Sequence, residues 1–548
     1  MSFISALDAF QKWEKNTPNL PFLHQNIHGE KLTVTYQEAG EQARKMASAI
    51  KGLGIEEGSH VAILSKNCSH WIMADLAILM AGCVSIPIYP TTDKDTIKLI
   101  LEHSDSKAVF VGKLDDYASQ KEGVDAVDIP RIGIEMHGVN EQYGWDELVK
   151  KNQPLQEVFK PKSDDLMTIL YTSGTTGNPK GVMHKYGSVE FAVKEFEHHF
   201  SLPKNPRFFA FLSLAHIAER AAYEFIGLYL GGSIAFPESI ETFPANLAEA
   251  KPHMFFAVPR IFQKFQESIL KKMPQNRLDF LLKLPILNSV IKKKIVGALG
   301  LQEAVSVISG AAPISPDLQH WFKKLDLDVN QGYGMSEDVC VSHMNFPGQN
   351  KIGTVGQKYD HIQTKLSGEG EVCLKSDCLT LGYYKEPEKT AELFDEEGFL
   401  KTGDLGEYDH DGYLSIVGRV KDQFKTDKGK YISPNHLELP LSDNPDIEQV
   451  CVVGTGIPQP IALIVPSETG KELSQDALRA SVESSLNSLN PTLPNYEKIA
   501  KAIVMKEDWT IDNGLLTPTL KLKRNNLEKI HQPYYSEWFS KNDTVIFE

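Results

Sequence analysis

The apolar residues 167–170 lead directly into the sequence Tyr171-Thr-Ser-Gly-Thr-Thr-Gly-Asn-Pro-Lys180-Gly181. Its glycines permit unusual backbone angles, and its small hydroxyl residues let N–H groups and side-chain oxygens approach a polyphosphate closely. Lys180 adds a cation. The stretch is not a Walker A loop, because the pattern G-x-x-x-x-G-K-[ST] does not fit it. Composition alone would be typical of an ordinary loop, but the full string after an apolar strand predicts a phosphate-binding site.

Four further motifs follow this loop in order along the chain. They are Gly310-Ala311-Ala312-Pro313, Gln331-Gly-Tyr-Gly-Met-Ser-Glu337, Lys401-Thr-Gly-Asp404 and Gly418-Arg-Val-Lys-Asp422. With the loop they resemble the signature of the adenylate-forming superfamily, which includes acyl-CoA synthetases, peptide-synthetase adenylation domains and firefly luciferase. Ser336 stands where the YGxTE motif of the family usually has threonine. The resemblance covers residues 30 to 530, and the agreement of five ordered motifs is not a matter of chance.

The resemblance implies that the chain binds ATP, Mg²⁺ and coenzyme A. Thr172 and Glu337 are implied to hold Mg²⁺, which prefers hard oxygen ligands. The residues implied to contact the nucleotide are Thr172, Ser173, Gly174, Thr175, Thr176, Gly177, Lys180, Gly310, Ala311, Ala312, Gln331, Gly332, Tyr333, Gly334, Ser336, Asp404, Arg419, Lys421 and Lys521.

Some of these residues have a defined part in the implied site. Tyr333 is implied to stack on adenine and Arg419 to reach the ribose and phosphate side. Asp404 is implied to accept hydrogen bonds from both ribose hydroxyls, since an ionised carboxylate offers two acceptor oxygens. Outside their motifs, residues of these types would more often be turn or surface residues.

A basic motif lies near the C-terminus, Leu516-Thr-Pro-Thr-Leu-Lys521-Leu-Lys-Arg524. It resembles the last motif of the family, in which a lysine contacts the reacting carboxylate and the α-phosphate. Lys521 is the expected residue, with Lys523 as the alternative, because Leu520 replaces the common glycine. The implied catalytic residues are Thr172, His216, Glu337 and Lys521.

Three segments resemble the long-chain acyl-CoA synthetases in particular. They are Leu212-Ser-Leu-Ala-His216-Ile-Ala-Glu-Arg220, Lys425-Thr-Asp-Lys-Gly429-Lys-Tyr-Ile-Ser-Pro434 and the C-terminal motif. His216 is implied to lie near the acyl pocket, although a packed core histidine is the alternative. Lys428 stands where the subgroup usually has glycine, which affects the implied contacts to coenzyme A.

The resemblance implies a fatty acid–CoA ligase for medium or long chains. The carboxylate attacks the α-phosphate of ATP to give acyl-AMP and pyrophosphate, and the thiol of coenzyme A then displaces AMP. Between the steps the small C-terminal domain of the family rotates about a hinge, which maps to Lys421. Two alternatives stay open: an acyl-AMP ligase that loads a carrier protein, and a nucleotide-binding protein without turnover. The sequence indicates neither the length of the acyl chain nor the oligomeric state.

The pattern of apolar residues predicts an α/β protein. Residues 35–54 read as a helix with a Thr35/Glu38 capping box and a terminal Gly54. Expected strands at 60–64, 108–112, 167–171, 208–213, 233–236, 254–258 and 305–309 alternate with helices, which favours largely parallel sheets. We expect a large N-terminal domain over 1–420, with a β-rich subdomain over 350–420, and a small mobile α+β domain over 421–548.

Composition excludes several other classes. The 548 residues carry a net charge of −15, which argues against general nucleic-acid binding. The six cysteines are scattered, and no signal peptide is apparent, so we expect a soluble cytoplasmic protein. Residues 71–90 are apolar but contain Asp75, Gly82 and Pro87, so they read as helix, turn and buried strand. The basic stretch 264–294 is expected to be a solvated face, with contact to an anionic membrane surface as the alternative.

Overall fold

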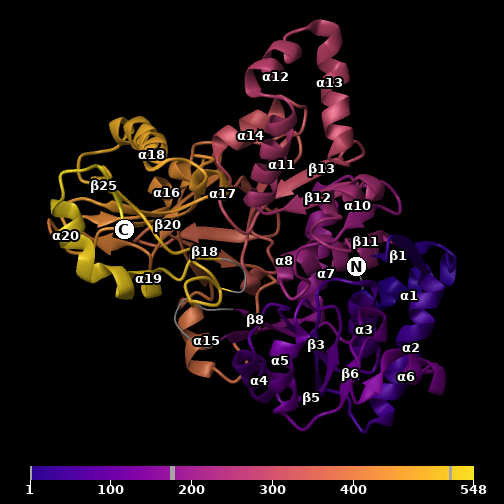
Figure 1. Cartoon of the computed structure of the whole chain (residues 1–548). Coiled ribbons are helices and arrows are strands. Elements are labelled where there is room, and N and C mark those ends of the chain that lie inside the picture. Colours follow the sequence, from indigo (N-terminus) through magenta and orange to yellow (C-terminus); the bar gives the residue numbers. More distant parts are fainter. Residues whose placement is uncertain (1–2, 173–178, 518–520) are drawn as a thin grey trace.

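The computed structural model describes residues 3–172, 179–517 and 521–548. Figure 1 shows a large N-terminal part, coloured indigo to orange, beside a smaller C-terminal part in orange and yellow. Five residues that the sequence predicts to contact the nucleotide lie outside the described residues: Ser173, Gly174, Thr175, Thr176 and Gly177.

The first sheet of the N-terminal part has seven strands and ends at the predicted phosphate loop. Its strands are parallel except for the last pair, in which Thr172 lies opposite Lys180. In spatial order they are β7 (Tyr143–Gly144), β6 (Arg131–Gly133), β5 (Ser106–Val111), β3 (His60–Leu64), β4 (Val84–Ile88), β8 (Leu166–Thr172) and β9 (Lys180–Lys185).

Three further sheets complete this part. In each sheet, strands that are neighbours in the order given are hydrogen-bonded to each other. One contains β10 (Arg207–Phe209), β11 (Ser233–Phe236), β1 (Pro21–Ile27) and β2 (Glu30–Thr35). The next contains β12 (Met254–Ala257), β13 (Ser306–Ser309), β14 (Val329–Tyr333), β15 (His343–Met344) and β16 (Gln357–Lys358). The last is antiparallel and contains β17 (Gln363–Leu366), β18 (Glu371–Lys375), β19 (Leu400–Tyr408) and β20 (Leu414–Arg419).

The C-terminal part has its own four-stranded sheet with helices packed against it. Two separate hydrophobic clusters include residues of this sheet. Its strands are β23 (Ile447–Val453), β24 (Ile461–Pro466), β25 (Lys501–Val504) and β26 (Val545–Phe547), and a short pair, β21 (Phe424–Lys425) and β22 (Tyr431–Ile432), precedes them. The main helices are α16 (Asn435–Leu441), α18 (Gln475–Leu489), α19 (Arg524–His531) and α20 (Tyr535–Ser540). The fold is α/β with mostly parallel sheets in the large N-terminal part, which confirms the predicted class.

Helices α2 (Tyr36–Gly52) and α3 (Ser69–Met80) show how sequence pattern becomes packing. The capping box of α2 is present, with Thr35 and Glu38 bonded reciprocally, and Gly54 has a positive φ of 81° just beyond the helix. Every residue of α3 is buried, which explains why apolar residues occur on all sides of the helix. One core cluster joins both helices to the β3 and β1 sheets.

The strand expected over residues 208–213 is shorter in the structure. β10 ends at Phe209, because the chain turns away toward α8 (Ile217–Glu219). The side chain of Asn67 fixes this turn, since its Oδ1 accepts the N–H of Leu214 at 2.8 Å. The early end of the strand brings His216 to the cavity described below.

Helices α11 (Pro259–Lys272), α12 (Gln275–Leu282) and α13 (Pro285–Ala298) carry the basic stretch. Figure 1 shows α12 and α13 projecting from the body at the top of the view. Within the described residues, each helix is too short or too polar to cross a lipid bilayer.

Candidate functional site

A single cavity of about 530 Å³ collects most of the predicted site residues. This volume lies within the roughly 300–1,000 Å³ range of small-molecule sites. The predicted residues that line it are Thr172, His216, Gly310, Ala311, Ala312, Gln331, Gly332, Tyr333, Gly334, Ser336, Glu337, Asp404, Arg419 and Lys521.

Two described residues of the predicted set, Lys180 and Lys421, are not among those that line the cavity. The ammonium of Lys180 lies 4.7 Å from the ring centre of Tyr383, which does line it. Lys421 is exposed in the connection between the two parts of the chain.

Asp404 organises the polar end of the cavity from β19. The side chain is buried, and both of its oxygens are engaged. The Tyr333 hydroxyl donates to Oδ2 at 2.8 Å, and Nε of Arg419 donates to Oδ1 at 2.7 Å. Burial, followed by the nearby Asp404 charge, raises the pKa of Tyr333 well above its usual range. Because each carboxylate oxygen can accept more than one hydrogen bond, Asp404 keeps acceptor capacity for a ligand.

Glu337 lies in a short turn after β14 and is 8% exposed. Its Oε1 accepts the hydroxyl of Tyr383 at 2.8 Å. Burial raises the pKa of Glu337, while the hydrogen bond from Tyr383 and the charges of Lys180 and Arg419 act in the opposite direction. Tyr383 leaves the second carboxylate oxygen for another ligand.

Glu337 and Thr172 offer the kind of oxygen ligands that a hard cation prefers. Both residues line the same cavity, and they offer a carboxylate and a hydroxyl oxygen. These are ligands that Mg²⁺ accepts, usually together with water and substrate phosphate. The donor set therefore agrees with the metal that the motifs imply.

Lys521 reaches the cavity from the C-terminal part. Its backbone N–H donates to the Thr517 hydroxyl at 3.0 Å, and its carbonyl accepts the N–H of Thr517 at 2.8 Å. Lys521 is exposed to solvent and lines the cavity. Burial and then the charge of Arg419 lower the pKa of Lys521. Lys523, the alternative from the sequence, stands immediately before α19 and is not among the described lining residues.

His216 stands between the polar and apolar ends. Its Nδ1 accepts the N–H of Ala218 at 3.1 Å, so the neutral ring carries its proton on Nε2. Burial and the charge of Lys521 lower the pKa of His216 to about 4. The imidazole is therefore uncharged at neutral pH and can act as a hydrogen-bond donor.

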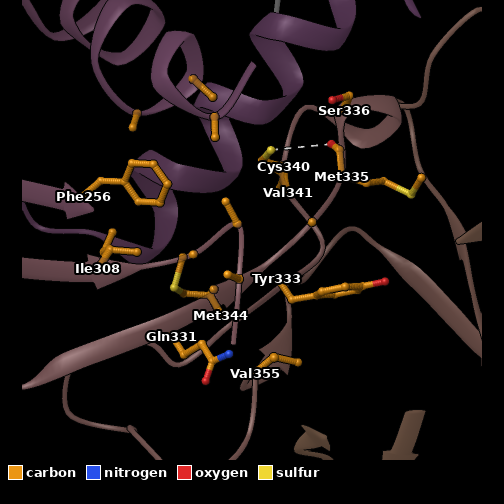
Figure 2. A pocket seen from close by; sticks show the side chains of 18 of the residues that line it. Phe256, Ile308, Gln331, Tyr333, Met335, Ser336, Cys340, Val341, Met344 and Val355 are labelled. Atoms are coloured by element: carbon orange, nitrogen blue, oxygen red, sulfur yellow. Dashed lines mark hydrogen bonds between the residues drawn. The ribbon is translucent and has the colours of Figure 1, made fainter. Parts of the chain in front are cut away.

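The opposite end of the cavity is apolar. Small side chains leave the space open along one wall, and larger apolar side chains close it; Figure 2 shows several of the latter around the cavity. The residues are Ala192, Val193 and Phe196 from α7 (Tyr186–His199), Ala218, Ala221, Ala222, Phe225 and Ile226 from the helices after His216, and Met254, Phe256, Ile308, Val339, Val341, Met344 and Tyr359.

A π-helical turn, Arg220–Phe225, aims part of this wall at the cavity. Arg220 is fully buried and donates to Asp75 at 2.7 Å, to Glu224 at 2.6 Å and to Thr168 at 3.0 Å. Burial raises the pKa of Glu224 to about 8, although Arg220 opposes that rise. The network fixes the turn to α3 and β8, and so it positions Ala221 and Ala222.

Val339 and Cys340 adopt positive φ angles of 54° and 57° in succession. A β-branched residue rarely takes this conformation, which costs about 1–3 kcal/mol per residue. The Cys340 thiol donates to the carbonyl of Met335, as Figure 2 shows. In this strained conformation, Val339 and Cys340 both line the cavity.

Sequence reasoning missed Tyr383, the Val339–Cys340 pair and the alanine wall. Tyr383 lies 46 residues from its partner Glu337 and outside the quoted motifs. A positive φ at Val339 has no signal in residue type, since glycine is the usual marker. The alanines follow the Leu212–Arg220 motif directly, and their small size was the one available signal.

Comparisons with known proteins identify two matching families and several similar sequences. Residues 10–384 match the family described as AMP-binding enzyme, and residues 421–532 match that described as AMP-binding enzyme C-terminal domain. A long-chain-fatty-acid–CoA ligase of Mycobacterium bovis is 29% identical over 93% of each chain. Long chain acyl-CoA synthetase 1 of Arabidopsis thaliana is 28% identical over 94% of this chain and 88% of its own.

Solved structures share the fold. The adenylation domain of a carboxylate reductase from Mycobacterium chelonae has a TM-score of 0.82 at 22% identity, covering 99% of this chain and 92% of that chain. An anthranilate CoA ligase in complex with anthranoyl-AMP has a TM-score of 0.79 at 20% identity, covering 97% and 98%.

Proposed function

Because the chain belongs to the AMP-binding family of adenylate-forming enzymes, we propose that it is a fatty acid–CoA ligase for medium or long chains. One observation carries the proposal: a single cavity joins a polar end, with Asp404, Arg419 and Lys521, to an apolar end walled by Ala221 and Ala222. The long-chain acyl-CoA ligases among the relatives support the choice of acid and thiol.

The first half reaction would form acyl-AMP. A carboxylate oxygen attacks the α-phosphorus of ATP, and the bond from that phosphorus to the leaving pyrophosphate breaks. Both reactants are anions, so positioning and neutralisation of charge supply most of the catalysis. Lys521 and Arg419 provide the positive charge, Asp404 and Tyr333 hold the nucleoside, and Nε2 of His216 donates toward the acyl group.

Mg²⁺ would be held by Glu337 and Thr172 and would neutralise phosphate charge. This assignment requires Glu337 to be ionised. The hydrogen bond from Tyr383 favours the ionised form in a buried place, so Tyr383 supports the cation site without occupying it.

The second half reaction would transfer the acyl group to coenzyme A. The thiol sulfur attacks the carbonyl carbon of acyl-AMP, the bond from that carbon to the AMP oxygen breaks, and the thiol proton is released. We propose domains over 1–420, with the β-rich subdomain over 350–420, and 421–548, with rotation about Lys421. The rotation would withdraw Lys521 and bring residues 425–430 toward the thiol.

Loading of a carrier protein in place of coenzyme A is the second candidate. One fold neighbour is the A-PCP didomain of a carboxylic acid reductase from Segniliparus rugosus, which supports this second candidate. Either acceptor uses the same first half reaction, so the two candidates differ only in the second half reaction.

The proposal is tested in two assays with the same panel of acids of graded chain length. Exchange of labelled pyrophosphate into ATP reports the first half reaction, and acyl-CoA formation reports the second. We expect both with medium- or long-chain acids. Exchange without acyl-CoA, but with transfer to a carrier protein, would select the second candidate. Absence of exchange with every acid would reject an adenylating enzyme and leave a nucleotide-binding protein without turnover.

We further propose that α12 and α13 bring the enzyme to an anionic membrane, where free fatty acids concentrate. Residues 259–300 contain nine basic and two acidic residues in a chain of net charge −15. The projecting helices also expose Phe280, Leu287 and Val290, at 62%, 45% and 57%. A basic surface with exposed apolar side chains is typical of interfacial helices.

This membrane contact is tested by sedimentation with vesicles of phosphatidylglycerol or phosphatidylcholine. We expect binding to the anionic vesicles only. When Lys293 and Lys294 are both changed to Glu, binding should weaken by at least about tenfold. The matched control reverses two exposed lysines elsewhere, Lys506→Glu with Lys529→Glu. Equal loss in both double variants would show a general charge effect and refute the assignment to these helices.

A further inference from the structure

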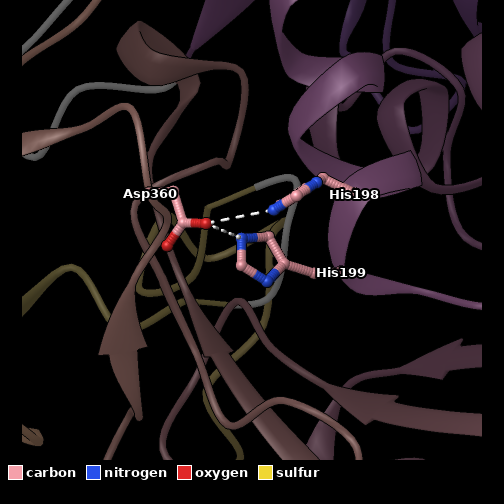
Figure 3. A group of neighbouring side chains, drawn as sticks. All are labelled: His198, His199 and Asp360. Atoms are coloured by element: carbon pink, nitrogen blue, oxygen red, sulfur yellow. Dashed lines mark ion pairs between the residues drawn. The ribbon is translucent and has the colours of Figure 1, made fainter.

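Three potential metal ligands meet outside the cavity, where α7 ends against the segment before β17. They are His198, His199 and Asp360, which Figure 3 shows converging from the two segments. Their ligand atoms all lie within 4.8 Å of one another. Two imidazoles and a carboxylate form a donor set that suits a divalent transition metal, zinc above all.

The spacing of the ligand atoms fits one ion. Oδ2 of Asp360 lies 3.2 Å from Nε2 of His198 and 3.7 Å from Nε2 of His199. Two ligands bound to a tetrahedral zinc at ordinary bond lengths are roughly 3.3 Å apart. The observed separations therefore need only small side-chain movements to match zinc coordination.

His199 gives an independent reason to expect a ligand. Its Nε2 is buried and makes no hydrogen bond to the part of the chain that the structure describes. Buried polar atoms normally have a partner, so an orphaned nitrogen calls for one. The ring is held in place by stacking on Phe346, with ring centres 4.1 Å apart and planes 18° apart, and by an edge contact with Tyr359.

The second segment is already anchored beside these residues. Glu195, one turn earlier on α7, is buried and accepts the backbone N–H of His361 at 3.3 Å. Its carboxylate also pairs with the ring of His361. Asp360 is thus kept next to His198 and His199 by contacts that do not involve an ion.

We propose that His198, His199 and Asp360 bind one Zn²⁺, with water completing the coordination. The ion would tie α7 to the segment that carries Tyr359, and both segments line the apolar end of the cavity. Since the three ligands are not among the lining residues, the zinc would be structural, and the proposal is independent of the proposed function.

The test uses the full chain, without a histidine tag and freed of metal by a chelator. Zn²⁺ is titrated by calorimetry, and the midpoint of thermal unfolding is followed in parallel. We expect one Zn²⁺ per chain and a higher unfolding midpoint. His198→Gln, His199→Gln and Asp360→Asn should each weaken binding by about tenfold or more.

Two histidine variants serve as controls. His361→Gln removes a neighbouring ring outside the ligand set, and His320→Gln removes an exposed ring elsewhere. His320→Gln should bind Zn²⁺ as the unaltered chain does, and His361→Gln, which keeps all three ligands but loses the ring contact with Glu195, should weaken binding less than the ligand variants do. His198 is 63% exposed, so its variant separates loss of a ligand from loss of folding. Absence of stoichiometric binding, or equal affinity in the His198 and Asp360 variants, would overturn the proposal.

Discussion

Replacing Tyr383 by phenylalanine removes one hydroxyl and leaves the aromatic ring in the cavity wall. That hydroxyl is the donor to Oε1 of Glu337 at 2.8 Å. The ring contact with Lys180, at 4.7 Å, should survive the change. The variant therefore isolates one hydrogen bond to the carboxylate that we assign to Mg²⁺.

The size of the effect follows from burial. A hydrogen bond to a charged group contributes about 1.5–3 kcal/mol, and the screening that weakens surface contacts is small for a side chain only 8% exposed. About 1.4 kcal/mol is a factor of ten, so Glu337 should hold its proton roughly ten to a hundred times more tightly. Its pKa, already raised by burial, should rise further.

The sign of the pH dependence is fixed by the form that binds the cation. Ionised Glu337 is required, so activity falls as the pH decreases through its pKa. In Tyr383→Phe this acid limb should move to higher pH, and more Mg²⁺ should be needed near the limb. Pyrophosphate exchange is measured across pH at several Mg²⁺ concentrations.

The neighbouring Tyr384→Phe is the matched control. Its hydroxyl donates to Asp105 at 3.1 Å, away from Glu337. The control should keep the acid limb of the unaltered enzyme. An unshifted acid limb in Tyr383→Phe, with the Mg²⁺ dependence also unchanged, would refute the assigned role of Tyr383 and the cation site built on it.

Three other changes test separate parts of the site. Lys521→Ala should greatly slow pyrophosphate exchange but spare thioester formation from supplied acyl-AMP, whereas Lys523→Ala should leave exchange near normal; equal loss of both half reactions in Lys521→Ala would reject the division. Lys421→Pro should impair the thioester step more than the adenylation step, because proline fixes φ. A normal rate of thioester formation would contradict the assignment of the hinge to Lys421. Arg220→Met should lower the free energy of unfolding by about 3–5 kcal/mol in urea titrations, since it leaves buried carboxylates unpaired, and a loss below 1 kcal/mol would contradict this.

Local rules predicted the parts of the fold whose causes lie close together in sequence. The α2 helix was predictable because Thr35 and Glu38 cap it within one turn. β10 was predicted too long because its end is set by Asn67, about 140 residues earlier in the chain. Hydrophobic pattern carries no information on such a distant hydrogen bond.

The site residues also include some that the motifs indicated and others that only the structure reveals. Motifs indicated Tyr333 and Asp404 separately, and the structure adds that they bond to each other across 71 positions. The Leu212–Arg220 motif did not indicate that its residues lie in different environments. His216 lines the cavity, whereas Arg220 lies in a buried network. Tertiary packing decides which residues of one motif meet the substrate.

The crowding of Arg419 and Lys521 has a consequence for the order of events. Burial and Arg419 lower the pKa of Lys521, which means that the charged amine is less stable here than in water. A bound triphosphate would reverse that balance, and the departure of pyrophosphate would restore it. In the rotation that we propose, repulsion between these two cations would favour withdrawal of Lys521 only after the first bond has been made and pyrophosphate has left.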